Sequence, residues 1–279
     1  MNSNVNTLGP DSRYSYRQEL AAAHGLLGSA GETLTLQGAE AVQACIAPAS
    51  RLAICTDPQG MAADRFRLLC LGLRGLAASG KLKTLLVTSA LPKEGKSTIA
   101  LNLAACLADR SDESVVLVET DFRHPSLVER LGLEPWPGLV QSLEDNTDPF
   151  SAIRRVDPLG FYLLPAGKTA ANPVELLNSG RISATFQRLR ASADWVILDS
   201  PPACPVPDLL AIKPQADGCL WVVRADSTPR EAVEEAIQQV GRKLILGIVL
   251  NEAQGLENSY AQYPGYGIPR GEISLRLTS

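Results

Sequence analysis

LLVTSALPKEGKSTIALNLAACLA, residues 85–108, is the stretch that decides the fold. A short apolar run leads into a turn, then into Gly95-Lys96-Ser97-Thr98, and then into an apolar segment of helical length. In a phosphate-binding loop, backbone N–H groups and a helix N-terminus surround the phosphate oxygens, a lysine reaches the β- and γ-phosphates, and a hydroxyl binds Mg²⁺. The residues expected to bind a nucleotide in this way are Glu94, Gly95, Lys96, Ser97 and Thr98.

Two features of this stretch leave an alternative open. Ala90 occupies the position where the full pattern has its first glycine, and a helix capped by Ser97 needs no ligand. The order strand, turn, helix nevertheless favours a nucleotide site over a plain helix start.

Short apolar runs and helical patterns alternate along the rest of the chain. The apolar runs lie at 85–89, 115–118, 161–165, 195–199, 219–223 and 244–251. Helical patterns lie at 62–78, 97–109, 181–191 and 229–243. This alternation predicts an α/β fold with a doubly wound, mostly parallel sheet and ligands at the carboxyl ends of the strands. We expect an N-terminal extension or linker at 1–50, a catalytic domain at 51–255 and a flexible tail at 256–279.

Composition narrows the class of protein. The chain has 279 residues, 45% of them hydrophobic and 20% charged, which is typical of a soluble globular protein. A formal net charge of −4 gives no reason to expect a nucleic acid partner. The six cysteines form no C-x-x-C pair, which favours reduced thiols in a cytosol. Because we find neither a secretory signal nor about eighteen consecutive apolar residues, we expect any membrane association to come through a partner.

Carboxylates follow two further apolar runs. VVLVETDFRHPSL, residues 115–127, carries Glu119 and Asp121 at the end of one run, and DWVILDSPP, residues 194–202, delivers Asp199 to the end of another. Because parallel strands end at one edge of the sheet, we expect these acids beside the phosphate loop. Carboxylates there hold Mg²⁺ directly or through water, and one can accept the proton of an attacking hydroxyl. Three converging strand ends disfavour the alternative that each acid only caps a turn.

The stretch YAQYPGYG, residues 260–267, gathers three of the six tyrosines of the chain: Tyr260, Tyr263 and Tyr266. No helical or strand period places them on one buried face, and the proline and glycines break any regular element. These phenols are therefore either part of a disordered tail or a substrate segment.

Taken together, these motifs resemble the bacterial tyrosine kinases of capsule and exopolysaccharide synthesis, among them the soluble autokinases of exosortase-linked loci. SALPKEGKST, VVLVETDFRHP and WVILDSPP are similar to the Walker A, A′ and B motifs of that family, and the terminal tyrosine cluster is similar to its tail. LLPAGKTAANPVELLNS is similar to a further segment of the family, as is LGIVLNEA. The resemblance covers about residues 51–267 and implies a P-loop NTPase fold of the MinD/ParA-like type.

The resemblance also implies an activity and site roles. It implies an ATP- and Mg²⁺-dependent protein-tyrosine autokinase with Lys96, Asp121 and Asp199 in catalysis. Ser97, Asp199 and Glu119 would serve the metal, and Asn251 would face the adenine. Phosphorylation is expected on the tail, at Tyr260, Tyr263 and Tyr266. The expected partners are further copies of the chain and a membrane-embedded activator or chain-length protein that recruits it from the cytoplasm to the inner face of the membrane.

Two departures from the family pattern stand out. Glu119 occupies the position of the first Walker A′ aspartate and is one methylene longer, although an aspartate there is expected to keep or raise activity. The oligomerisation pattern E-x-x-R-x-x-R reads Asp64, Arg67 and Cys70 here. Two alternatives to the kinase stay open: a MinD/ParA-like ATPase, and a nucleotide-binding regulator without kinase activity, which Glu119 and Cys70 keep open. Leu91 lies where the MinD/ParA-like ATPases carry a second lysine, which counts against the first of these.

Overall fold

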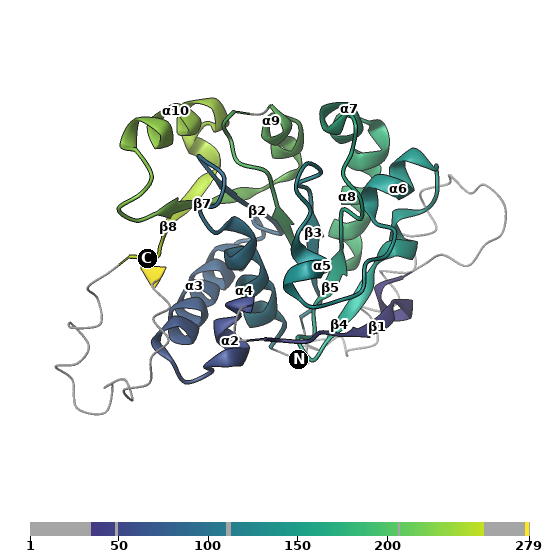
Figure 1. Ribbon diagram of the computed structural model, residues 1–279, viewed down its shortest axis with the longest axis horizontal. Coiled ribbons are helices and arrows are strands. Elements are labelled where there is room, and N and C mark those ends of the chain that lie inside the picture. The colour runs from purple at the N-terminus through teal and green to yellow at the C-terminus, as the bar shows by residue number, and fades with distance from the viewer. Residues whose placement is uncertain (1–34, 48–49, 110–112, 206, 254–276, 279) are drawn as a thin grey trace, which may run out of the picture. The chain divides into compact units, whose positions relative to one another are not determined.

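A mostly parallel sheet positions the site in this computed structural model (Figure 1). The structure describes residues 35–47, 50–109, 113–205, 207–253 and 277–278, all within the unit Leu34–Ser279. Within these residues the strand order is β1-β4-β5-β3-β6-β2-β7-β8-β9. The strands are β1 Glu40–Gln43, β2 Thr84–Ser89, β3 Val115–Glu119, β4 Arg154–Asp157, β5 Tyr162–Leu164, β6 Trp195–Asp199, β7 Gly218–Arg224, β8 Ile245–Asn251 and β9 Leu277–Thr278. The β4–β5 and β8–β9 pairs are antiparallel, and every other described pair is parallel.

Helices cover both faces of this sheet. The α-helices are α2 Ala53–Thr56, α3 Met61–Ala77, α4 Lys96–Ala108, α5 Leu127–Arg130, α6 Leu139–Glu144, α7 Pro173–Leu177, α8 Gly180–Ser192, α9 Asp208–Ile212 and α10 Arg230–Val240. Short 3₁₀ turns lie at Leu36–Gly38, Pro149–Ala152, Lys213–Gln215 and Arg242–Leu244. Helices α2, α3 and α4 pack on one face, and α6, α8, α9 and α10 pack on the other (Figure 1).

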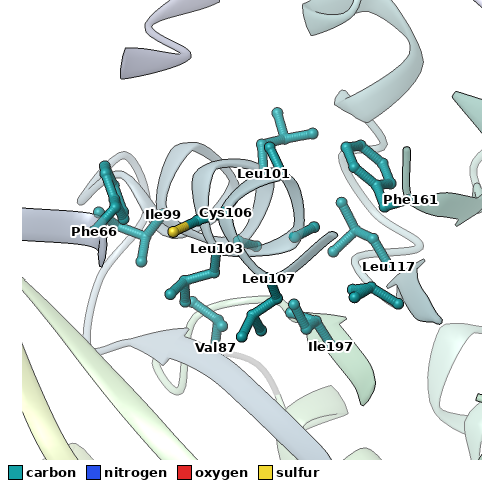
Figure 2. Close-up of a cluster of buried hydrophobic side chains, with 14 of the residues drawn as sticks. Phe66, Val87, Ile99, Leu101, Leu103, Cys106, Leu107, Leu117, Phe161 and Ile197 are labelled. Atoms are coloured by element: carbon teal, nitrogen blue, oxygen red, sulfur yellow. The ribbon is translucent and has the colours of Figure 1, made fainter. Parts of the chain in front are cut away.

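Side chains alternate along each central strand and so contribute to two hydrophobic cores, one on each face of the sheet. Leu85 and Val87 of β2 face the α3–α4 layer, whereas Leu86 between them faces the opposite layer. Figure 2 shows Leu103 and Leu107 of α4 against the sheet side chains. Since each such leucine is fully buried, it contributes about 1.5–3 kcal/mol to folding. This packing fixes α4, and with it the loop that precedes α4, above the centre of the sheet.

All six predicted strands and four predicted helices are present, with bounds that differ by a few residues. The largest difference is at α10, which ends at Val240 because Gly241 adopts a φ of 90°. The sequence predicted neither β1 nor β4, because Glu40–Gln43 and Arg154–Asp157 carry no apolar run. Strand β1 lies within the segment 1–50 that was expected to be an extension or linker, and it pairs with β4 in the sheet.

Candidate active site

The phosphate-binding loop joins β2 to α4. Gly95 precedes α4 with a φ of 100°, a left-handed conformation that favours glycine. A Cβ atom at this position would lie 2.1 Å from the side-chain nitrogen of Asn251, so a larger residue would also displace that amide. Lys96 follows with only 7% of its surface exposed, at the point where α4 begins. The sequence therefore places the lysine at a buried helix N-terminus, as a phosphate site needs.

Hydrogen bonds that involve side chains hold the phosphate-binding loop in place. The carboxylate of Glu94 is buried, and its Oε2 accepts a hydrogen bond of 2.9 Å from the N–H of Leu91. Its Oε1 accepts a hydrogen bond from the hydroxyl of Thr228, which the sequence did not predict. The amide of Asn251 donates to the carbonyl oxygen of Glu94 at 3.0 Å. Glu94 and Asn251 thus contact the loop itself, and their predicted contacts with the nucleotide stay predictions.

Asp199 is the last residue of β6, the strand that lies between β2 and β3 in the sheet. The parallel registers pair it with Val87 of β2 and with Glu119 of β3. Its side chain is buried, and among the described residues its Oδ1 has no hydrogen-bond partner. Burial raises the pKa of Asp199 to about 7, although the charge of Lys96 and a hydrogen bond from Ser97 act in the opposite direction. An unpaired buried carboxylate oxygen beside a serine hydroxyl suits a bound cation.

Glu119 lies next to Asp199 but has a different environment. Its Oε1 accepts hydrogen bonds from the N–H groups of Ser126, at 2.5 Å, and Leu127, at 2.8 Å. Its Oε2 accepts a third from the N–H of Ala166 at 3.0 Å. Burial raises the pKa of Glu119, while these three donors act to lower it. Both oxygens therefore already accept hydrogen bonds from the protein, in contrast to Oδ1 of Asp199.

Asp121 lies on the loop after β3, because the strand ends at Glu119. Its Oδ1 accepts hydrogen bonds from the N–H groups of Arg123 and His124, at 3.3 and 3.1 Å. Its side chain is 15% exposed, which leaves it accessible to a substrate hydroxyl. The imidazole of His124 is 85% exposed, and its Nδ1 lies 4.0 Å from the carboxylate of Asp121.

Two arginines near this loop were not predicted as site residues. Arg123 makes two hydrogen bonds, of 2.8 and 3.2 Å, to the buried carboxylate of Asp208 at the start of α9. Arg130 at the end of α5 donates to the hydroxyl of Ser126 at 3.1 Å and approaches that of Thr98 at 3.5 Å. No motif flags these contacts, since they depend on which loops the sheet brings together.

The edge formed by β2, β3 and β6 can hold a nucleotide and Mg²⁺. Backbone N–H groups at the start of α4 suit phosphate oxygens, and Ser97 with Asp199 suits the cation. Within the part of the chain that the structure describes, no group of three or more His, Cys, Asp and Glu residues could hold a metal alone. Mg²⁺ that is bound together with substrate phosphates uses one or two protein carboxylates. The predicted tyrosines 260, 263 and 266 lie outside the described residues.

The described residues contain no helix long and apolar enough to cross a membrane.

Known proteins provide an independent comparison. No family model matches the chain. The chain is 30% identical over 189 residues to the tyrosine-protein kinase CpsD of Streptococcus agalactiae, covering 66% of this chain and 82% of that protein. It is 31% identical over 214 residues to the succinoglycan biosynthesis transport protein ExoP of Rhizobium meliloti, covering 75% of this chain. The same alignment covers 27% of ExoP, so this chain spans about a quarter of that relative.

Solved structures show the same fold. The kinase domain of the Escherichia coli tyrosine kinase ETK matches with a TM-score of 0.68 at 24% identity, over 73% of this chain and 82% of that one. The septum site-determining protein MinD of Pyrococcus horikoshii, complexed with Mg-ADP, matches with a TM-score of 0.52 at 18% identity, over 67% and 74%. The predicted P-loop NTPase fold of the MinD/ParA-like type is thus confirmed. The similarity to CpsD extends over most of both sequences, and the chain belongs to the family of bacterial tyrosine-protein kinases.

Proposed function

We propose that this chain is an ATP-dependent protein-tyrosine autokinase that regulates exopolysaccharide polymerisation or export. The observation that carries the proposal is the meeting of Lys96, Ser97 and Asp199 at one strand edge, in a member of the kinase family. The name of ExoP supports the exopolysaccharide context, since it refers to biosynthesis and transport of succinoglycan. The exosortase-linked subtype stays a prediction.

In this proposal each residue at the edge has a separate role. The N–H groups of residues 95–98 bind phosphate oxygens, and Lys96 stabilises the charge on the transferred phosphoryl group. Asp121 accepts or orients the proton of the tyrosine hydroxyl, which its partial exposure permits. Ser97 and Asp199 would hold Mg²⁺, which would supply positive charge to the phosphate groups.

The tyrosine-containing tail is the proposed phosphoryl acceptor. Tyr260 follows Asn251, the last residue of β8, by nine positions. Nine extended residues span at most about 30 Å, which is enough to reach the site of the same chain or of a neighbour. Each phosphate adds a charge of about −1.5 to −2, so successive phosphates would repel one another and favour release. We therefore propose phosphorylation in trans between copies, on Tyr260, Tyr263 and Tyr266.

A mixing experiment tests this function. A Lys96→Met chain with intact tyrosines is mixed with an active chain carrying Phe at 260, 263 and 266, in the presence of ATP and Mg²⁺. Phosphotyrosine mapped by mass spectrometry is expected on the tail of the inactive copy. ATP hydrolysis without phosphotyrosine would assign the chain to the MinD/ParA-like ATPases. Nucleotide binding without turnover would make it a regulator without kinase activity.

We also propose a location and a partner. The chain would act in the cytoplasm and be recruited to the inner face of the membrane by a membrane-embedded activator or chain-length protein. Co-purification of that protein, with increased phosphotyrosine in its presence, is the expected result.

A further inference from the structure

We propose that Glu119 is a positioning residue of the kinase site, which holds two loops around Asp121 instead of binding the metal. This inference rests on the proposed function, because it concerns the geometry of phosphoryl transfer. It starts from the three hydrogen bonds that the Glu119 carboxylate accepts, from Ser126, Leu127 and Ala166. A carboxylate that is only 1% exposed needs such donors, because burial without them is unfavourable.

These bonds fix one end of the loop that carries Asp121. At its start, the hydroxyl and N–H of Thr120 donate to the carbonyl oxygen of Asp199, at 2.9 and 2.8 Å. In its middle, Arg123 is paired with Asp208 of α9. At its end, Ser126 and Leu127 donate to Glu119. Asp121 therefore lies between anchored points, and Glu119 supplies the last of them.

The third bond attaches a second loop to the same carboxylate. Ala166 follows β5, and its carbonyl oxygen accepts the N–H of Val140 in α6 at 3.0 Å. Pro165 likewise accepts the N–H of Leu139 at 2.8 Å. One carboxylate thus connects β3, the start of α5 and the loop that supports α6.

The length of the side chain matters for this connection. The backbone of Glu119 is fixed by pairing with Asp199 in β6, so its carboxylate position depends on the side chain alone. An aspartate is one methylene shorter and cannot reach Ser126, Leu127 and Ala166 together from this backbone. On this proposal aspartate lowers activity at this position, contrary to the expectation drawn from the family resemblance.

The position of α5 also determines where the positively charged side chain of Arg130 lies relative to the phosphate-binding loop. Arg130 is the last residue of α5, and its guanidinium approaches the hydroxyl of Thr98 at 3.5 Å. Because Glu119 bonds the first turn of that helix, losing it would release both Asp121 and Arg130. The expected defect is in phosphoryl transfer, with little change in metal binding.

Glu119→Asp and Glu119→Gln test the proposal, with Glu129→Gln as the matched control. Glu129 is an exposed glutamate on α5. The measurements are kcat for autophosphorylation at saturating ATP, the dissociation constant for ATP, and the Mg²⁺ concentration at half-maximal rate. All are made well below the melting temperature of each variant, so that the protein compared is folded.

We expect Glu119→Gln to lower kcat about ten-fold and Glu119→Asp to lower it further, with ATP affinity and half-saturating Mg²⁺ within about two-fold of wild type. The control is expected to match wild type throughout. A ten-fold rise in half-saturating Mg²⁺ for Glu119→Gln would make Glu119 a metal ligand and overturn the proposal. An unchanged kcat in folded Glu119→Gln, or full activity in Glu119→Asp, would overturn it as well.

A second readout separates this inference from the proposed function. Hydrogen exchange at the N–H groups of Ser126, Leu127 and Ala166 is expected to accelerate in Glu119→Gln and stay unchanged in Glu129→Gln. Unchanged exchange in Glu119→Gln would overturn the positioning role. If the wild-type chain makes no phosphotyrosine but the exchange result holds, the kinase proposal fails while the anchoring of the two loops stands.

Discussion

Glu119 and Asp199 are paired across β3 and β6, yet their carboxylates have opposite environments. Glu119 accepts three hydrogen bonds from backbone N–H groups. Asp199 is as deeply buried and has an oxygen that accepts none from the described residues. The two acids look equivalent in the sequence. In the structure, the protein satisfies the hydrogen-bonding capacity of Glu119 but leaves one oxygen of Asp199 available to a ligand.

The difference indicates that one acid at this edge of the sheet has a structural role and the other a chemical role. A buried carboxylate oxygen without a hydrogen-bond partner destabilises a fold, so such an oxygen persists where a function requires it. A buried carboxylate with three donors stabilises the loops that it connects. Replacing each group of the site in turn tests this division.

Replacement of Lys96 by Met should lower autophosphorylation by about 10³-fold or more, since it removes the cation that stabilises the transferred phosphoryl group. The measurement is phosphotyrosine formation by a folded variant, and Lys93→Met is the control because Lys93 is exposed on the same loop. Wild-type activity in folded Lys96→Met would contradict the assignment of the phosphate site, and with it the comparison of the two acids.

Asp199→Asn should lower activity by about 10²–10³-fold and also increase the thermal stability of the ligand-free protein at pH 8. The folded pKa of about 7 lies above the ordinary value of 3.8, so the folded state holds the proton more tightly than the unfolded state. The destabilisation by the ionised group is thus absent below about pH 4, grows as the pH rises, and is complete above about pH 7.

Melting temperatures at pH 5 and pH 8 check this prediction. The gain for Asp199→Asn should be about 5 °C at pH 8 and smaller at pH 5. Mg²⁺ with ATP should stabilise the wild type more than the variant. A loss of stability at pH 8 would show that Asp199 is as well satisfied as Glu119.

Asp121→Asn should lower phosphoryl transfer by about 10²-fold while ATP affinity changes by less than about three-fold, because the proton acceptor acts in the transition state. Steady-state rates and equilibrium ATP binding separate the two effects. If both fall in proportion, Asp121 belongs with Asp199 as a metal ligand, and the loop after β3 contributes no acid dedicated to proton transfer.

Asn251→Ala should have the smallest effect, weakening ATP binding by about ten-fold. It leaves the carbonyl oxygen of Glu94 without its donor and opens space beside Gly95. Asn178→Ala is a suitable control, since it removes a similar bond, from Asn178 to the carbonyl of Val174, at an exposed helix end. Equal ATP affinity in the variant and wild type would show that the phosphate loop does not depend on this contact.

The sequence predicted the central sheet well, because strands buried on both faces are continuous apolar runs such as 195–199. It also placed Lys96, Ser97 and Asp199 at one edge, since parallel strands end together. It could not predict the partners of Glu119, because Ser126 and Ala166 carry no motif and donate through the backbone. Nor could it predict the contact between Thr228 and Glu94, which are 134 positions apart.

Strand β1 has a practical consequence for the solution behaviour of shortened chains. Its exposed positions include Glu40 and Gln43, so the outermost strand on this side of the sheet carries polar side chains, which discourage pairing between molecules. A chain that starts at residue 51 would lose β1 and uncover the backbone N–H and C=O groups of β4. Such a chain could keep the residues of the candidate active site in place and still associate with other molecules through the exposed edge of β4. A shortened chain meant for expression should therefore begin before residue 36, not at residue 51.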